Sequence, residues 1–226
     1  MMLRAAICMA PLLSLASAAV AKSDSQPHWD STLLSRLEAL ALLQGLNVDL
    51  LSHDSATLVL EKWCDTHHIA APAHIVAEGD RNTHKEPTSE QLRRLEVNNG
   101  QTIRYRRVKL LCGSDVLSEA DNWYVPDRLT ADMNRVLDTT DISFGHVVAP
   151  LRFQRHTLSA DLLWSPLPKG WETETTIAIA GNGPLQVPSH VLQHHAILTR
   201  ADGKPFSELI ETYTSAVLDF PLPVPR

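Results

Sequence analysis

A β-hairpin near the middle of the chain is the feature that most constrains the fold. The segment Ile103–Cys112 alternates in side-chain type, breaks at Gly113-Ser114-Asp115 and continues as a second strand, Val116–Val125. Strands joined by so short a turn pair antiparallel. Turn residues bound further segments of strand character, which are Ala73–Glu78, Arg152–Trp164, Thr175–Ala180, Ser189–Arg200 and Phe206–Ala216.

Two of the strands echo each other. Leu117–Tyr124 and Phe206–Tyr213 both begin with an apolar residue, Ser and Glu, and both end with Tyr. Each also follows a turn and a preceding strand. The echo predicts two related halves that contribute strands to one antiparallel sheet, unless the two hairpins are similar by chance.

Helical patterns precede and interrupt the strands. Ser31–Asn47 carries leucines at helical spacing, with Ser31 or Thr32 as its cap and Gly45 as its end. A second helix is expected to begin at Asp54-Ser55, whose side chains can accept free amide protons. Together with the strands, these helices predict an α+β fold, a curved antiparallel sheet with helices packed on one side.

Two connections complete this prediction. Asp80–Asn99 is polar and is expected to be an exposed connection. Thr130 is expected to cap a third helix, and Ser143-Phe144-Gly145 is expected to form a turn after it.

The N-terminus indicates export. Arg4 is followed by the apolar run Ala5–Val20, and the small residues Ala19-Val20-Ala21 precede a cleavage position after Ala21. The alternative is a membrane anchor, but a run of about 16 residues is short against the roughly 20 that span a bilayer. We therefore expect a signal peptide over 1–21 and a periplasmic or secreted protein with no stable membrane insertion.

The rest of the chain divides simply. We expect a linker over 22–30, a single domain over 31–220 and a proline-rich tail over 221–226. Removal of the signal leaves Cys64 and Cys112, which either pair in an oxidising compartment or remain two buried thiols.

Composition narrows the function. A formal net charge of −6 argues against a general nucleic-acid binder, and 44% hydrophobic with 20% charged residues is a globular composition. The adjacent pairs His67-His68 and His194-His195 do not suggest a metal site, because neighbours on a strand face opposite sides. We expect no metal and no cofactor, and the sequence does not set the oligomeric state.

Four short motifs carry a resemblance. They are Asp54-Ser55-Ala56-Thr57 at a helix start, Tyr105–Cys112 in a strand, Ser143-Phe144-Gly145 in a turn, and Gly203-Lys204-Pro205 in the last hairpin. Their order resembles chorismate lyase and the wider chorismate-lyase-like fold, which effector domains of some bacterial transcription regulators share. That enzyme eliminates pyruvate from chorismate to leave 4-hydroxybenzoate, without a metal.

The resemblance implies a ligand site. The arginine that holds the substrate carboxylate falls on Arg107, the turn that approaches the ligand on Phe144, and an apolar contact of the enzyme on Ala56. Tyr105 shares the strand parity of Arg107, which we expect to face the interior. A guanidinium there suits bidentate capture of a carboxylate, or it pairs with a nearby Glu or Asp.

The second family residue is a glutamate near the ring. Counted from Gly-Lys-Pro, its position falls on Ile210, and a shift of one residue places it on Glu211, with Glu208 as the other candidate. Partial burial would make Glu211 competent to donate or take a proton, whereas an ion pair would give it a structural role.

The prediction that follows is an exported chorismate-lyase-like protein with an enclosed pocket for a small aromatic or cyclic carboxylate. Either it is a carbon–oxygen lyase with Arg107 and Glu211 as its catalytic residues, or it is a non-catalytic binding module or a structural envelope protein.

Overall fold

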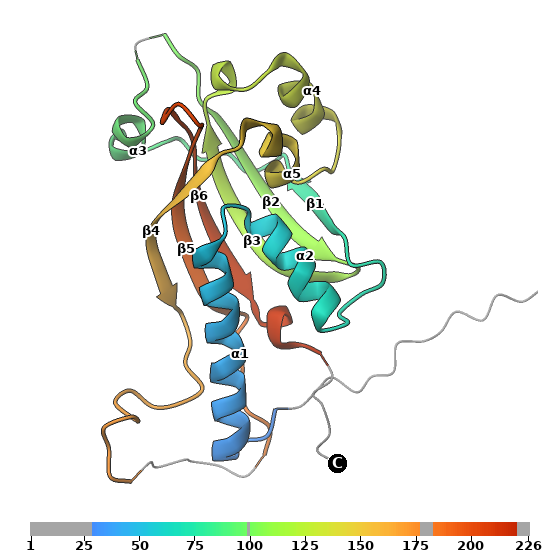
Figure 1. Ribbon diagram of the computed structural model, residues 1–226, viewed down its shortest axis with the longest axis vertical. Coiled ribbons are helices and arrows are strands. Elements are labelled where there is room, and N and C mark those ends of the chain that lie inside the picture. The colour runs from blue at the N-terminus through green and yellow to red at the C-terminus, as the bar shows by residue number, and fades with distance from the viewer. Residues whose placement is uncertain (1–28, 99, 177–182, 221–226) are drawn as a thin grey trace, which may run out of the picture.

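A six-stranded antiparallel sheet organises the computed structural model, which describes residues 29–98, 100–176 and 183–220 (Figure 1). The predicted signal peptide, most of the linker, the tail, and most of the predicted strand Thr175–Ala180 lie outside these residues. In the described ranges, no helix combines the length and the apolar character needed to cross a bilayer.

The strand order is β1-β2-β3-β6-β5-β4. The predicted hairpin is confirmed as β2 and β3, and the strands expected after residue 150 are present except for the one outside the described ranges. The strands are β1 Ile75–Asp80, β2 Arg104–Cys112, β3 Asp115–Tyr124, β4 Gln154–Leu162, β5 His190–Thr199 and β6 Pro205–Thr214.

The sequence echo lies at the centre of the sheet. Its two segments fall on β3 and β6, which are antiparallel neighbours, and Ser118 pairs with Tyr213 just as Tyr124 pairs with Ser207. Equivalent positions therefore pair across a local two-fold relation. Each half adds two further strands outward, so the predicted duplication is confirmed in the strand order.

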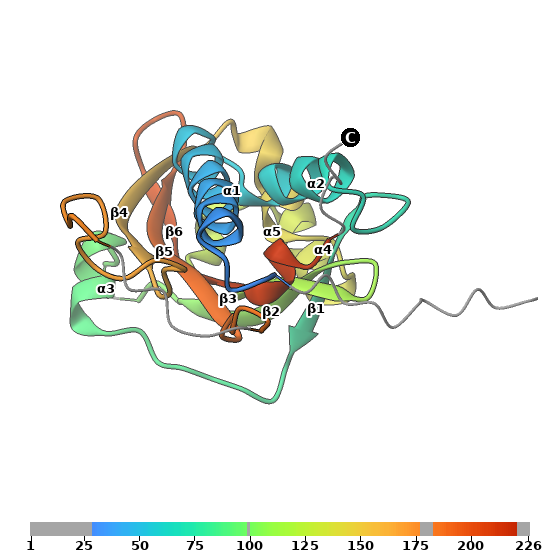
Figure 2. The ribbon, with the colours of Figure 1, turned by 90° about the horizontal axis from the view of Figure 1, so that it is seen from below.

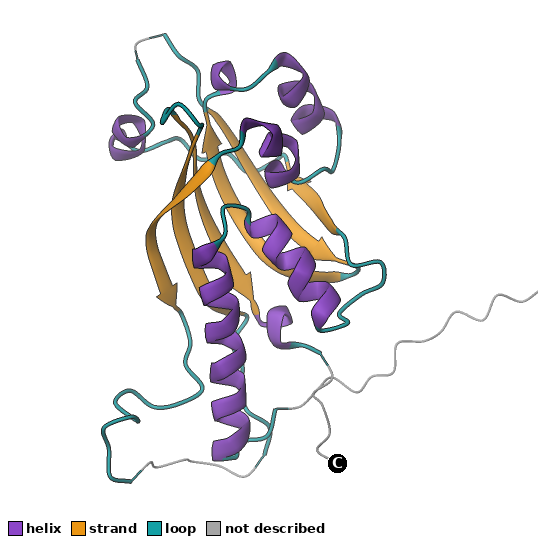
Figure 3. Cartoon of the chain, viewed as in Figure 1, coloured by secondary structure: helices purple, strands orange, loops and turns teal. Residues whose placement is uncertain are grey.

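Four helices, α1, α2, α4 and α5, cover one face of the sheet (Figure 3). Thr32, Ser55 and Thr130 cap α1, α2 and α4, as the sequence predicted. The end predicted at Gly45 is wrong, because the leucine pattern continues and α1 runs on to Ser52. The helices are α1 Leu33–Ser52, α2 Ala56–Thr66, α3 Ser89–Arg94, α4 Ala131–Thr139 and α5 Phe144–Val148, with 3₁₀ turns at Pro126–Arg128, Ala149–Leu151 and Ser215–Leu218.

The connection Asp80–Asn99 departs from the prediction. Its described part, residues 80–98, crosses the opposite face of the curved sheet and forms α3 there (Figure 2). Arg94 of α3 donates to Glu208 of β6 at 2.5 and 3.0 Å, and the Trp123 indole donates to the Lys85 carbonyl at 2.9 Å. This segment is therefore bonded to the sheet, and one short helix lies on the side expected to have none.

Two apolar clusters form the core. One joins α1 and α2 to every strand except β4, and the other joins α4 and α5 to the end of β3, to β5 and to β6. A disulfide between Cys64 of α2 and Cys112 of β2, with Cα atoms 6.5 Å apart, ties the first cluster together. The sequence left open a disulfide or two buried thiols, and the structure has the disulfide.

Candidate functional site

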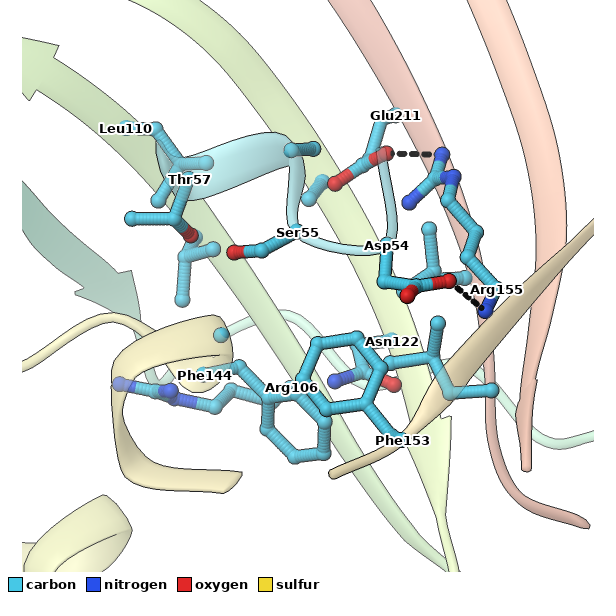
Figure 4. A pocket seen from close by; sticks show the side chains of 16 residues that line it. Asp54, Ser55, Thr57, Arg106, Leu110, Asn122, Phe144, Phe153, Arg155 and Glu211 are labelled. Atoms are coloured by element: carbon cyan, nitrogen blue, oxygen red, sulfur yellow. Dashed lines mark hydrogen bonds and ion pairs between the residues drawn. The ribbon is translucent and has the colours of Figure 1, made fainter. Parts of the chain in front are cut away.

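A small cavity, the inner hollow, lies between the two apolar clusters (Figure 4). The first turn of α2, the strands β2, β3, β5 and β6, the start of β4, and α5 form its walls, which are mostly apolar. Its volume is about 40 Å³, room for a few water molecules at most. An aromatic ring can enter only if a wall moves.

An ion pair closes one end of the inner hollow. The Arg155 guanidinium donates to the Glu211 carboxylate at 2.6 Å, and the two side chains are 3% and 8% exposed. The backbone N–H of Arg155 donates to Asp54 at 2.9 Å (Figure 4). The Tyr213 hydroxyl donates to the Glu211 carboxylate at 3.2 Å. Burial opposes the charge on Arg155, but Glu211, Tyr213 and Asp54 together outweigh burial and raise the pKa of Arg155.

Arg106 is the second cation of the inner hollow, beside Phe144 of α5 (Figure 4). Its Nη1 atom is buried, and no hydrogen-bond partner for it exists within the described ranges. Burial lowers the pKa of the guanidinium from its ordinary value. A buried cationic donor without a hydrogen-bond partner is costly, and the charges of Asp141 and Asp138 offset only part of the effect of burial.

The wall beside Arg106 is the helical turn α5. Gly145 of α5 packs against the start of α2 so closely that a Cβ atom on it would lie 2.8 Å from the Thr57 hydroxyl and 3.0 Å from the Ser55 hydroxyl. Phe144 beside it contacts the rings of Tyr124 and Phe206. The turn therefore closes the inner hollow and depends on the absence of a side chain at residue 145.

His194 lies behind the ion pair. It is opposite Glu211 in the β5–β6 register and is fully buried, and its Nε2 atom donates to the Asn47 side chain at 2.8 Å. Burial, assisted by the charge of Arg155, lowers the pKa of His194 to about 4. The imidazole is therefore neutral at pH 7.

Three of the residues predicted for the site line the inner hollow. They are Ala56, Phe144 and Glu211, and the carboxylate of Glu211 points inward. Of the two candidate glutamates, Glu211 therefore faces the inner hollow. Glu208 lies on the opposite face of the sheet, where the Arg94 and His195 side chains donate to its carboxylate. Burial works against ionisation of Glu208, but these hydrogen bonds prevail and lower its pKa.

The predicted positions of Arg107 and Tyr105 in the site are wrong. Both side chains lie on the face of β2 away from the inner hollow, where Arg107 contacts Glu119 at 3.4 Å and Asp121 at 3.8 Å. The Tyr105 hydroxyl donates to Asp121 as well. The predicted strand parity was off by one residue, which turns every side chain to the other face. Arg106 is the arginine that reaches the hollow.

Arg106, Arg155 and Asp54 were not predicted as site residues. Arg106 shares strand parity with the buried residues Val108, Leu110 and Cys112 of β2. Nothing in the sequence links Arg155 to Glu211, because the two residues meet only through the register of β4, β5 and β6. In the described part of the chain, no group of three or more His, Cys, Asp or Glu side chains is placed to hold a metal.

No family model matches the chain. A protein of Sinorhizobium fredii, the uncharacterized protein y4mC, is 49% identical over 217 residues, which are 96% of this chain and 92% of that protein. A relative of this identity and coverage shares the fold of the whole domain.

Several solved structures are more distantly similar. PhnF from Mycobacterium smegmatis is 10% identical, with a TM-score of 0.48, over 78% of this chain and 69% of its own. A GntR-family transcriptional regulator from Enterococcus faecalis is 11% identical, with a TM-score of 0.39, over 66% and 99%. YydK from Bacillus subtilis, titled a possible transcriptional regulator, is 14% identical, with a TM-score of 0.39, over 66% and 62%. These similarities are too weak to carry an argument about function.

Proposed function

The chain belongs to the same family as the y4mC protein of Sinorhizobium fredii, and we propose that it binds a small organic carboxylate, aromatic or cyclic, through Arg106 in the inner hollow. The observation that carries this proposal is the buried Nη1 atom of Arg106, which has no partner among the described residues. A carboxylate would supply the missing acceptor and the opposite charge at once.

The walls fit an aromatic or cyclic body for that carboxylate. Phe144, Phe153, Leu198 and Leu209 give the inner hollow its apolar surfaces. Because its volume is about 40 Å³, binding requires the α5 turn to move outward and then close again. Ligand entry is therefore coupled to a motion of Phe144.

Binding without catalysis is the function that the site supports best. A lyase of the chorismate type needs a carboxyl group free to exchange a proton with the ring. Glu211 does face the inner hollow, but Arg155 and Tyr213 already donate to its carboxylate. The lyase reaction remains an alternative, which an absorbance assay for 4-hydroxybenzoate formed from chorismate tests directly.

The test of binding uses two adjacent arginines on opposite faces of one strand. Arg106→Ala should weaken the binding of 4-hydroxybenzoate by about 2 kcal/mol, roughly 30-fold, as expected for the loss of a charge-assisted pair. Arg107→Ala removes the same charge from the other face and should leave the affinity unchanged. The proposal fails if Arg107→Ala has the larger effect, or if substituted benzoates do not bind at all.

We further propose that the chain is exported. The Cys64–Cys112 disulfide supports this, because such bonds persist in oxidising compartments and are rare in the cytosol. The predicted signal peptide is the other support. Cell fractionation with mass analysis should find a mature protein that begins at Lys22 outside the cytoplasm. A full-length chain in the cytoplasm, with Cys64 and Cys112 as free thiols, would contradict export.

A further inference from the structure

A second, larger cavity, the outer hollow, opens at the end of the sheet. Strand β1 stops at Asp80, which pairs with Arg107, whereas β2 begins at Arg104. The start of β2 thus extends past its neighbour, and the end of α4 with the following loop closes the other side. The volume is about 640 Å³, within the range of about 300–1,000 Å³ that holds a small organic molecule.

Arginines dominate the charge of the outer hollow. Arg81, Arg104, Arg106 and Arg107 all line it, and Arg106 also lines the inner hollow. Of these, Arg104 is paired with Asp138 at 2.9 Å. Arg107 faces Glu119 and Asp121, as described above. Two of the four guanidinium groups are thus already matched by carboxylates.

The other two arginines are not matched. Arg81 donates only to the backbone carbonyl of Asp138, at 3.1 Å, and Arg106 forms no ion pair with a described residue. The carboxylates of Asp80 and Asp141 also line the cavity. Asp80 accepts hydrogen bonds from its own turn, and Asp141 attracts Arg106 only from beyond ion-pair distance.

Two unmatched guanidinium groups on one cavity suit a doubly charged oxyanion better than a single carboxylate. Phosphate monoesters carry a charge of about −1.5 to −2 at pH 7 and offer three acceptor oxygens. Each planar guanidinium can donate to two of those oxygens at once. The size of the cavity leaves room for an organic group beside the phosphate.

We propose that the outer hollow binds phosphate, free or as a small phosphate monoester, through Arg81 and Arg106. This site is separate from the inner hollow and goes beyond the carboxylate site proposed above, although Arg106 contributes to both. Inorganic phosphate and phenyl phosphate distinguish the two sources: tighter binding of phenyl phosphate would assign the site to an ester, and equal or weaker binding would assign it to the free ion.

Calorimetric titration at constant ionic strength tests this proposal. Both probes should bind saturably, and Arg81→Ala should weaken that binding about tenfold, the effect of one lost charge-assisted hydrogen bond. Arg81 is exposed, so the variant should fold. Arg93→Ala is the matched control, because Arg93 is also exposed, lies on α3 and does not line the outer hollow.

The outcomes separate this inference from the proposed function. Failure of both probes to saturate at about 20 mM, far above the Kd of even a weak specific complex, would overturn the phosphate site. So would an equal loss in Arg93→Ala, which would show attraction to net charge alone. Arg81→Ala should leave 4-hydroxybenzoate binding unchanged. Phosphate binding without benzoate binding would support this site and refute the carboxylate site.

Discussion

Replacement of Arg155 by leucine should destabilise the protein strongly, because it leaves the Glu211 carboxylate buried without its cation. The two side chains are 3% and 8% exposed and meet at 2.6 Å, so water cannot replace the lost partner in the closed structure. Breaking a buried pair in this way costs about 3–5 kcal/mol. The Tyr213 hydroxyl still donates to the Glu211 carboxylate, which reduces the loss of stability by about 1 kcal/mol. We expect a net loss of about 2–4 kcal/mol.

A double-mutant cycle separates the ion pair from simple loss of packing. Arg155→Leu combined with Glu211→Leu removes both charges, so it should be more stable than Arg155→Leu alone. The measurement is the free energy of unfolding from urea denaturation. Arg135→Leu is the control, since it breaks an exposed pair with Asp132 and should change stability by at most about 1 kcal/mol.

Two results would refute this reasoning. Additive effects in the cycle would show that Arg155 and Glu211 are not coupled. A loss below about 1 kcal/mol in Arg155→Leu would show that Glu211 is hydrated, and therefore that the inner hollow is open to solvent.

Three other measurements probe the same architecture. As pH falls from about 6.5 to about 4, His194 is protonated in the unfolded chain before it is protonated in the folded chain. This difference alone should lower the free energy of unfolding by about 3 kcal/mol, and denaturation curves of His194→Gln should lack this contribution. Gly145→Ala should destabilise the protein by about 1–2 kcal/mol, whereas Gly45→Ala, where no atom lies within 4 Å of the new Cβ, should stabilise α1 by up to about 1 kcal/mol. Equal changes in the melting temperatures of the two variants would contradict the close packing of Gly145 against α2. Replacing Cys64 and Cys112 by alanine opens a loop of 48 residues and should lower the unfolding free energy by about 4 kcal/mol, and a loss near zero would mean that the bond does not form in solution.

The sheet was predictable because its signals are local. The turn Gly113-Ser114-Asp115 sets the β2–β3 hairpin, and the echo between Leu117–Tyr124 and Phe206–Tyr213 identifies the strands that meet at the centre. Side-chain hydroxyls at Thr32 and Thr130 likewise define helix starts from neighbouring residues alone.

The face of β2 was not predicted correctly, since alternation alone does not say which set of residues is buried. Arg107 was grouped with Tyr105 and Leu111, but the same set contains Lys109. The other set continues from Arg106 into Val108, Leu110 and Cys112, which are all buried. An uninterrupted apolar run is the better indicator of the inward face, and it assigns the arginine of the hollow correctly.

Helix α3 was not predicted, although its first residues carry a sequence signal. The Thr88 hydroxyl accepts from the Gln91 backbone N–H, and the Gln91 side-chain oxygen accepts from the Thr88 backbone N–H. The spacing of these two residue types indicates this reciprocal pattern from sequence. The pairing of Arg155 with Glu211 had no such signal. It depends on long-range strand register, which includes irregular pairing in both β4–β5 and β5–β6.

The most direct test of the central claim is a crystal structure of the protein soaked with 4-hydroxybenzoate. The carboxylate should lie about 3 Å from the Arg106 guanidinium inside the inner hollow, with Phe144 displaced from its present position. A ligand bound elsewhere, with Arg106 still lacking an anionic partner, would contradict the account.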